Sequence, residues 1–191
     1  DLLMSQKISP ELQDLRDALL RSRTSVYHLL VEPSTKMTLA EEGLIASLYQ
    51  FVGSLEDTRK YRQASSRVVF IDRVVNENLP FVERSVFYNV GSEAILNAVK
   101  YSGVDYKEDG EIKVILSESN GRFSLTIADN GWGFEYDEDN HDFTAYGINS
   151  MKEQLARLDD SASLDIKSAI GAGTKVIISW KSLPIKDHLT D

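Results

Sequence analysis

The most regular pattern in the chain is a long helical one that begins after Pro80 and ends near Ser102. Apolar residues recur in it at every fourth position, which keeps them on one face of a helix. They are Val86, Val90, Ala94 and Ala98. Glu93, Asn97 and Lys100 follow one another at intervals of four and three, so their side chains share a second face. That second face is too polar to belong to a hydrophobic core.

Two helical patterns precede this one. The first runs from Pro10 to about Leu30 and has a narrow apolar seam. The second starts at Thr38-Leu39-Ala40-Glu41, which has the sequence of a capping box, and reaches about Thr58. Its apolar stripe consists of Leu44, Leu48, Phe51 and Leu55. Two such helices cannot bury both seams by themselves, so we expect them to pack on the following domain, on a partner subunit, or on both.

Five segments have the alternation or the apolar run of a β-strand. They are residues 67–71, 111–117, 122–128, 163–167 and 174–180. Asn120-Gly121 separates the second from the third and is typical of a hairpin, because it accepts positive φ angles at little cost. Residues 146–158 form a further helical pattern. This order of elements predicts an α+β fold, a two-layer α/β sandwich whose mixed sheet has helices on one face, preceded by a helical hairpin.

Composition and charge narrow the classes of function. With 191 residues, 42% of them hydrophobic, the chain can bury a proper core. Its formal net charge of −9 argues against nucleic acid as the main partner, because phosphate backbones are bound by basic surfaces. The chain has no cysteine, which excludes disulfides and thiolate metal sites and fits a cytoplasmic location.

No apolar run approaches the length that spans a bilayer, so we expect no membrane contact by this segment. The chain starts at Asp1 without an initiator methionine. We therefore expect it to be part of something longer, with any sensor or membrane anchor outside it.

The polar face of the long helix combines three side chains that could bind a nucleotide. A carboxylate, an amide and an ammonium on one rigid element suit a triphosphate with its magnesium ion. Lys100 would be a cation for phosphate, Asn97 an oxygen ligand of Mg²⁺, and Glu93 a base or water-orienting group. The alternative is a solvated helix face with a polar i to i+4 pair, and the triplet alone does not decide between them.

Three further motifs follow in order along the chain. Asp129-Asn130-Gly131-Trp132-Gly133-Phe134 comes after a predicted strand, Gly147-Ile148-Asn149-Ser150-Met151 opens a predicted helix, and Gly171-Ala172-Gly173-Thr174-Lys175-Val176 opens the last strand. Together with Glu93-x-x-x-Asn97-Ala-x-Lys100, they resemble the ATP-binding domain shared by sensor histidine kinases, gyrase-type topoisomerases and mismatch-repair ATPases. Within that group the chain is most similar to two-component histidine kinases whose regulators have helix-turn-helix output domains. The resemblance covers roughly Arg67 to Trp180.

The resemblance implies a role for each motif residue. Asp129 would accept a hydrogen bond from the adenine amino group, which favours ATP over GTP, although Asp-Asn-Gly by itself is also a common turn after a strand. The acidic segment between Gly133 and Gly147 resembles a short ATP lid. Mg²⁺ would be held by Asn97, and Glu93 would be catalytic. The expected nucleotide-binding residues are Asn97, Lys100, Tyr101, Asp129, Gly131, Gly133, Phe134, Gly147, Ile148, Met151, Gly173 and Thr174.

The resemblance also implies an organisation and a reaction. We expect a helical dimerisation or linker segment over residues 1–60, an ATP-binding catalytic domain over residues 61–183 and a tail over residues 184–191. The γ-phosphoryl group of Mg-ATP would pass to a histidine and then to an aspartate of a response-regulator receiver domain, in a full-length protein that is a homodimer.

The histidines depart from this pattern. The family's phosphoacceptor histidine precedes an acidic residue on the dimerisation helix, whereas His28 precedes Leu29 and His141 and His188 lie in the lid and the tail. We therefore expect the acceptor upstream of Asp1. A milder departure is Asp159-Asp160-Ser161, where relatives carry a glycine turn. The alternative function is a non-kinase regulatory module that binds nucleotide and sequesters a partner, as anti-sigma factors on this fold do.

Overall fold

The computed structural model describes residues 38–61, 66–75, 77–136 and 146–182. Its elements in order are α2 (Gly43–Tyr61), β1 (Arg67–Arg73), α3 (Phe81–Tyr101), the short 3-10 helix η1 (Val104–Tyr106), β2 (Glu111–Ser119), β3 (Arg122–Asp129), α4 (Tyr146–Leu158), β4 (Ser163–Ala169) and β5 (Gly173–Lys181). The helix predicted over Pro10 to Leu30, most of the predicted lid and the tail lie outside the described residues. Within the described part of the chain, no helix is long and apolar enough to cross a membrane.

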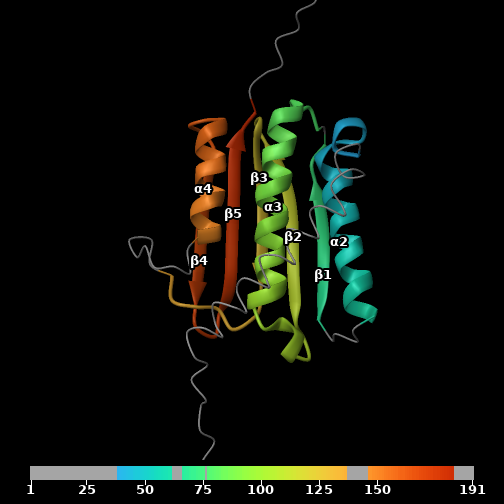
Figure 1. Cartoon of the computed structure of the whole chain (residues 1–191), viewed down its shortest axis with the longest axis vertical. Helices are drawn as coiled ribbons and strands as arrows, with labels where there is room; N and C mark the ends of the chain where they lie inside the picture. The colour runs from blue at the N-terminus through green and yellow to red at the C-terminus, as the bar shows by residue number, and fades with distance from the viewer. Residues whose placement is uncertain (1–37, 62–65, 76, 137–145, 183–191) are drawn as a thin grey trace, which may run out of the picture. The chain divides into compact units, whose positions relative to one another are not determined.

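The five strands form one mixed sheet in the order β1-β2-β3-β5-β4. Strands β1 and β2 are parallel, and the other neighbouring pairs are antiparallel. Figure 1 shows α2, α3 and α4 side by side on the same face of this sheet. The predicted two-layer α/β sandwich with helices on one face is therefore confirmed.

The core fills the space between the sheet and the helices. Alternate residues of the neighbouring strands β2 and β3 point into it and are almost fully buried. They are Ile112, Val114 and Leu116 on β2 and Phe123, Leu125 and Ile127 on β3. From β5, Trp180 stacks between Phe87 of α3, at a ring-centroid distance of 3.4 Å, and Phe123, at 5.3 Å. The period of two along each strand therefore separates the core face of the sheet from its other face.

The hairpin between β2 and β3 follows the sequence prediction closely. The two turn residues, Asn120 and Gly121, have φ angles of 54° and 72°. A two-residue turn with both φ angles positive matches the right-handed twist of the strands it connects. It sets the register in which Ser119 pairs with Arg122 and Ile112 with Asp129.

The start of α2 differs from the predicted capping box. A helical turn covers residues 38–41, and Glu42 follows it in a turn. Helix α2 then begins at Gly43, whose φ of 94° separates it from the preceding helical turn. The backbone N–H groups of Leu44 and Ile45 donate to the carboxylate of Glu77, at 2.5 Å and 2.9 Å. Glu41 is therefore not the cap of α2; a carboxylate 32 to 33 residues away in the chain caps it.

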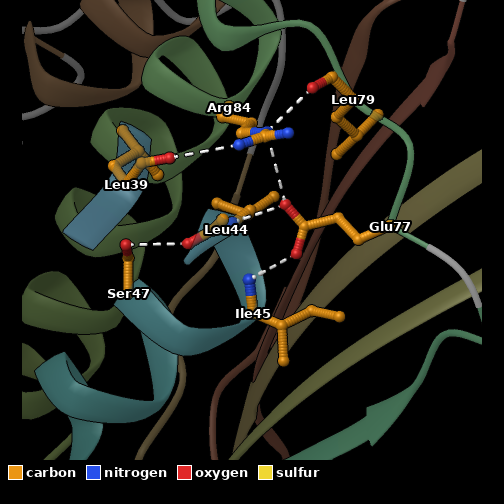
Figure 2. Close-up of polar contacts among 8 residues, drawn as sticks. Leu39, Leu44, Ile45, Ser47, Glu77, Leu79 and Arg84 are labelled. Atoms are coloured by element: carbon orange, nitrogen blue, oxygen red, sulfur yellow. Dashed lines mark hydrogen bonds and ion pairs between the residues drawn. The ribbon is translucent and has the colours of Figure 1, made fainter. Parts of the chain in front are cut away.

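Arg84 of α3 completes this contact, as Figure 2 shows. Its Nε lies 3.6 Å from Glu77 Oε1 and also donates to the carbonyl oxygen of Leu79 at 2.8 Å. Its Nη1 donates to the carbonyl oxygen of Leu39 at 3.4 Å. The two charged side chains are mostly buried, with 10% of Glu77 and 23% of Arg84 exposed. One ion pair thus connects the start of α2 to the loop before α3 and to α3 itself.

Helix α2 packs on the sheet and on α3. The four residues of its predicted stripe, Leu44, Leu48, Phe51 and Leu55, are all buried, and α2 contacts β1 and α3. The compact unit that contains the sheet begins at Leu39, whereas the sequence analysis placed a boundary between residues 60 and 61. The apolar stripe of α2 is therefore buried against elements that follow residue 66 in the chain.

Candidate functional site

The polar face of α3 meets the start of α4. Glu93 and Asn97 are partly buried, one turn apart on α3. Gly147 is the second residue of α4, and a Cβ built on it would lie 3.8 Å from both Asn97 Nδ2 and Glu93 Oε1. The carboxylate and the amide therefore lie beside the first turn of a helix. The N–H groups of such a turn are not used within the helix and attract anions.

Lys100 lies three residues after Asn97, in the last turn of α3, and is exposed. Of the other predicted residues near these helix ends, Tyr101 is exposed, Ile148 is half-buried and Met151 is buried in the core. Met151 therefore holds α4 against the sheet by packing. The sequence prediction grouped Glu93, Asn97, Lys100 and Gly147, and the structure brings the first two and Gly147 together.

Asp129 is the last residue of β3 and lies opposite Thr174 of β5. Its Oδ1 accepts hydrogen bonds from the backbone N–H groups of Gly131, at 2.9 Å, and Thr174, at 3.2 Å. Among the described residues, no hydrogen bond engages its Oδ2. The carboxylate is therefore fixed through one oxygen, and the other can accept from a ligand.

Burial raises the pKa of the Asp129 carboxyl above its usual value of 3.8. The hydrogen bonds from Gly131 and Thr174 and the positive charge of Lys107 act in the opposite direction, because each favours the ionised form. A carboxylate whose charge is partly desolvated gains more from a hydrogen-bond donor than one in water does.

Three glycines of the motifs allow segments of backbone to approach one another. A Cβ on Gly131 would overlap the carbonyl oxygen of Ser102, a Cβ on Gly133 that of Ala169, and a Cβ on Gly173 that of Asp129. Gly133 and Gly173 also have positive φ angles of 63° and 75°. A structural reason for glycine at these three positions is therefore the close packing of the protein's own backbone.

The end of α3 connects the two groups of residues. The N–H of Trp132 donates to the carbonyl oxygen of Ser102 at 2.7 Å, and Ser102 is the C-cap of α3. The Asp129 loop is therefore attached directly to the end of the helix that carries Asn97 and Lys100. Phe134, two residues after Trp132, is exposed.

Sequence reasoning missed several residues that shape this loop. The Ser168 hydroxyl contacts Thr174 Oγ1 at 2.9 Å and accepts from the N–H of Phe134 at 2.9 Å. The Asn130 side chain accepts from the N–H of Glu111 at 2.8 Å and donates to the carbonyl oxygen of Asp109 at 2.8 Å. The pairing of β4 with β5 places Ser168 opposite Thr174, a signal that exists only once the strand register is known.

The predicted loop after α4 keeps its turn without glycine. The N–H of Ser161 donates to Asp159 Oδ1 at 2.6 Å. Hydrogen bonds from the side chain of Ser161 and then from its backbone lower the pKa of the Asp159 carboxyl. An aspartate side chain that accepts from the backbone two residues later stabilises a turn in its own way. The Asp159-Asp160-Ser161 departure from the family pattern is therefore compatible with the fold.

Comparison with known proteins gives one family and several relatives. A family model described as histidine kinase-, DNA gyrase B-, and HSP90-like ATPase matches residues 83–184. The sensor histidine kinase LiaS of Bacillus subtilis is 24% identical over 192 residues, covering 95% of this chain and 49% of LiaS. The signal transduction histidine-protein kinase/phosphatase DegS of Brevibacillus brevis is 26% identical over 169 residues, covering 88% of this chain and 40% of DegS. The chain thus spans half or less of these relatives.

Two solved structures share the fold. The histidine kinase AdeS of Acinetobacter baumannii has a TM-score of 0.56 at 18% identity, covering 92% of this chain and 86% of that one. The histidine kinase domain of the Erythrobacter litoralis EL346 blue-light activated histidine kinase also has a TM-score of 0.56, at 20% identity, covering 73% and 61%. Likeness at this level of identity concerns the fold.

Proposed function

Because the chain belongs to the family of histidine kinase-, DNA gyrase B- and HSP90-like ATPases, we propose that it is the ATP-binding catalytic part of a two-component sensor histidine kinase. The names of the curated relatives support the kinase branch of this family. The observation that carries the proposal is the Asp129 carboxylate, fixed through Oδ1 at the end of β3 with Oδ2 available to a ligand.

In this proposal Asp129 reads the base. Its Oδ2 accepts a hydrogen bond from the exocyclic amine of adenine. Guanine has a carbonyl oxygen at that position, which would face the carboxylate without a proton between them. Thr174 and Gly131 hold the carboxylate in place through Oδ1, and Ser168 in turn contacts the hydroxyl of Thr174. ATP is therefore the preferred nucleotide.

The phosphates would lie between α3 and the start of α4. Lys100 supplies a positive charge, and the first N–H groups of α4 beyond Gly147 bind phosphate oxygens. Mg²⁺ takes oxygen ligands and is commonly held by one or two protein groups together with phosphate oxygens and water. The amide oxygen of Asn97 suits that role, because Asn97 is partly buried beside Gly147. When bound, Mg-ATP supplies the phosphoryl group and the ion neutralises its charge.

Glu93 would act on the phosphoacceptor. It lies one turn before Asn97 on α3, and its Oε1 faces Gly147 in the same way as Asn97 Nδ2 does. From there the carboxylate can accept a proton from, or orient, the imidazole that attacks the γ-phosphoryl group. The acceptor we propose is a histidine outside residues 1–191, and the phosphoryl group then passes to an aspartate of a receiver domain. The homodimer of the full-length protein is part of the same proposal.

Nucleotide titrations test the proposal. Calorimetry should detect binding of Mg-ATP to the chain and weaker binding when EDTA removes the magnesium. Asn97→Ala should abolish the magnesium-dependent part of the affinity and leave the fold intact, because Mg²⁺ has few protein ligands and loses one of them. Asn89→Ala is a matched control, since Asn89 is an exposed asparagine of the same helix.

The outcomes separate the possible functions. Unchanged Mg-ATP affinity in a folded Asn97→Ala variant would remove Asn97 from the site. No ATP binding by the wild-type chain would reject the proposal. ATP binding without any phosphorylation of a histidine, even when the upstream helix is supplied, would favour the regulatory binding module over the kinase.

A further inference from the structure

The sheet has a second face that no described helix covers. Helices α2, α3 and α4 lie on the face that carries the core residues, as Figure 1 shows. Residues directly opposite on neighbouring strands share a face. The register therefore identifies one row that crosses the middle of the second face: Ile71, Ile115, Thr126, Ile177 and Asp165. We call this second face of the sheet, centred on Ile115, the open face.

The open face has a charge opposite to that of the whole chain. The strand positions on this face hold seven lysines or arginines and two acidic residues, a net charge of +5. The chain as a whole has a net charge of −9, so the rest of it has −14. A positive surface on an acidic protein creates a local field that attracts anionic partners to this face.

The acidic residues of the open face are used within it. Glu111 pairs with Arg67 and with Lys113, each at 2.7 Å. Asp165 lies 3.6 Å from Lys167. The remaining four basic residues have no ion pair among the described residues: Arg73, Arg122, Lys175 and Lys181. The positive charge of the open face is therefore not neutralised by its own carboxylates.

Two like-charged pairs strengthen this observation. Lys167 of β4 lies directly opposite Lys175 of β5, and Arg122 of β3 lies directly opposite Lys181 of β5. Like charges directly opposite on neighbouring strands destabilise a sheet. These pairs lie toward opposite ends of β5, on either side of the row that contains Ile177. An anionic group docked over each pair would remove the repulsion.

The arrangement has an apolar centre and a basic rim. Ile71, Ile115 and Ile177 lie in the central row and are only partly buried, while the lysines and arginines lie in the rows beyond it. With strands about 4.8 Å apart and alternate residues about 6.8 Å apart, the face measures roughly 20 Å by 27 Å. A partly apolar centre inside a polar rim is the usual anatomy of a protein–protein interface, and this size fits a transient complex.

We propose that the open face is a docking site for an acidic protein surface whose carboxylates surround a small apolar patch. Single-stranded nucleic acid is the less suitable ligand, because such sites stack bases on aromatic side chains and the described strand positions of this face include none. A bilayer is also less suitable, since a twisted sheet is not flat and lacks the aromatic anchors of membrane-surface proteins.

This site is independent of the nucleotide site. Asp129 lies opposite Thr174 and Ile112, on the core face of the sheet. Partner docking and ATP binding can therefore occur at the same time, on opposite sides of β3 and β5. Failure of one proposal leaves the other intact.

A peptide probe tests the chemistry of the partner. The probe is a ten-residue peptide with two leucines at its centre and glutamate elsewhere, titrated into the chain and followed by amide chemical shifts. We expect shifts at Ile71, Ile115 and Ile177, and affinity at least tenfold higher than for the same peptide with serines in place of the leucines. The affinity should fall as salt is added, because the rim contacts are exposed ion pairs.

Charge reversal on β5 provides the decisive variants. Lys175→Glu together with Lys181→Glu should weaken peptide binding at least tenfold. The same double variant should raise the thermal midpoint, because each change converts a like-charged cross-strand pair into an oppositely charged one. Lost binding therefore cannot be due to unfolding. Lys152→Glu with Arg157→Glu on α4 changes the net charge equally and should leave peptide affinity within twofold.

Several outcomes would overturn the proposal. These are no shifts at the open face with millimolar peptide, equal binding of the leucine and serine peptides, or unchanged affinity in the β5 double variant. Tighter binding of a ten-nucleotide oligothymidine would identify the face as a nucleic-acid site instead. Tighter binding of vesicles made of one part phosphatidylglycerol to two parts phosphatidylcholine would identify it as a membrane-facing surface.

Discussion

Replacing Asp129 with asparagine separates the two tasks of this side chain. Asparagine keeps an oxygen that can accept from the N–H groups of Gly131 and Thr174, as Asp129 Oδ1 does. It replaces Oδ2 with an NH₂ group, which is a donor. The nucleotide's exocyclic amine would then meet a donor in place of a charged acceptor, whereas the loop that holds residue 129 would keep its hydrogen bonds.

The expected loss of ATP affinity follows from the strength of a hydrogen bond to a charged group. A hydrogen bond to a charged group contributes about 1.5 to 3 kcal/mol, and each 1.4 kcal/mol is a factor of ten in affinity, so ATP should bind about 10- to 150-fold more weakly. The free energy of unfolding at neutral pH should stay the same or rise slightly. Burial disfavours the Asp129 charge, as its raised pKa indicates, and asparagine carries none.

Two measurements and one comparison variant make the test. Calorimetry gives the ATP affinity, and urea unfolding gives the stability. Asp129→Ala removes both acceptor oxygens and leaves the N–H groups of Gly131 and Thr174 without their partner. That variant should lose about 1 to 3 kcal/mol of stability as well as ATP affinity, because unsatisfied donors carry a desolvation cost.

Two results would refute the reasoning about Asp129. The first is an Asp129→Asn variant that binds ATP within threefold of the wild type, since this would mean that Oδ2 receives no donor from the base. The second is a wild-type chain that binds GTP as tightly as ATP. A fall in stability in Asp129→Asn comparable to that in Asp129→Ala would show that asparagine fails to hold the loop.

Three further predictions concern the reaction, pH and backbone packing. The chain alone should not label itself from γ-labelled ATP. When the upstream helix is supplied, Glu93→Gln should lower the labelling rate more than it lowers the ATP affinity. Acid-labile self-labelling of the chain alone that is lost in His28→Gln would instead place the acceptor at His28. ATP affinity should fall as the pH drops through the raised pKa of Asp129, and this loss should be absent from Asp129→Asn, which does not titrate there. The same raised pKa means that protonation of Asp129 favours the folded state. The contribution of Asp129 to the free energy of unfolding should therefore fall as the pH rises through this window. Gly173→Ala should destabilise the fold by clearly more than the roughly 1 kcal/mol expected for Gly121→Ala. The φ angles are similar, 75° at Gly173 and 72° at Gly121, but of these two glycines only Gly173 lies against a carbonyl oxygen. Equal losses of stability in urea unfolding would contradict this.

The sequence predicted those parts of the fold whose signals are local. Alternation along β2 and β3 and the Asn120-Gly121 turn were sufficient for the hairpin, and α4 begins and ends at the predicted residues. The cap of α2 could not be predicted, because Glu77 lies more than thirty residues from the N–H groups it accepts from. The local motif at Thr38–Glu41 lies in a separate helical turn before α2, so it carried no information about the cap of α2.

The candidate site likewise contains some residues that the sequence could predict and others that it could not. Asp129, Asn97 and Glu93 stood out because their residue types occur in a motif with a chemical meaning. Ser168 and Asn130 did not, because their contacts depend on which strands are neighbours and on how the loops fold back. The open face was also hidden in the sequence, since the total charge is negative and its basic residues are distributed over five strands.

The ion pair of Glu77 with Arg84 has a practical consequence for dissecting or fusing this protein. A shortened chain that begins at Arg67 would lack α2 and leave Glu77 and Arg84 without the N–H groups and the carbonyl oxygen of Leu39 that they now contact. It would also expose the apolar surfaces of β1 and α3 that α2 covers, which favours aggregation. Chimeras that join this unit to a different upstream segment should therefore have their junction before Leu39, so that they contain α2 together with the sheet on which it packs.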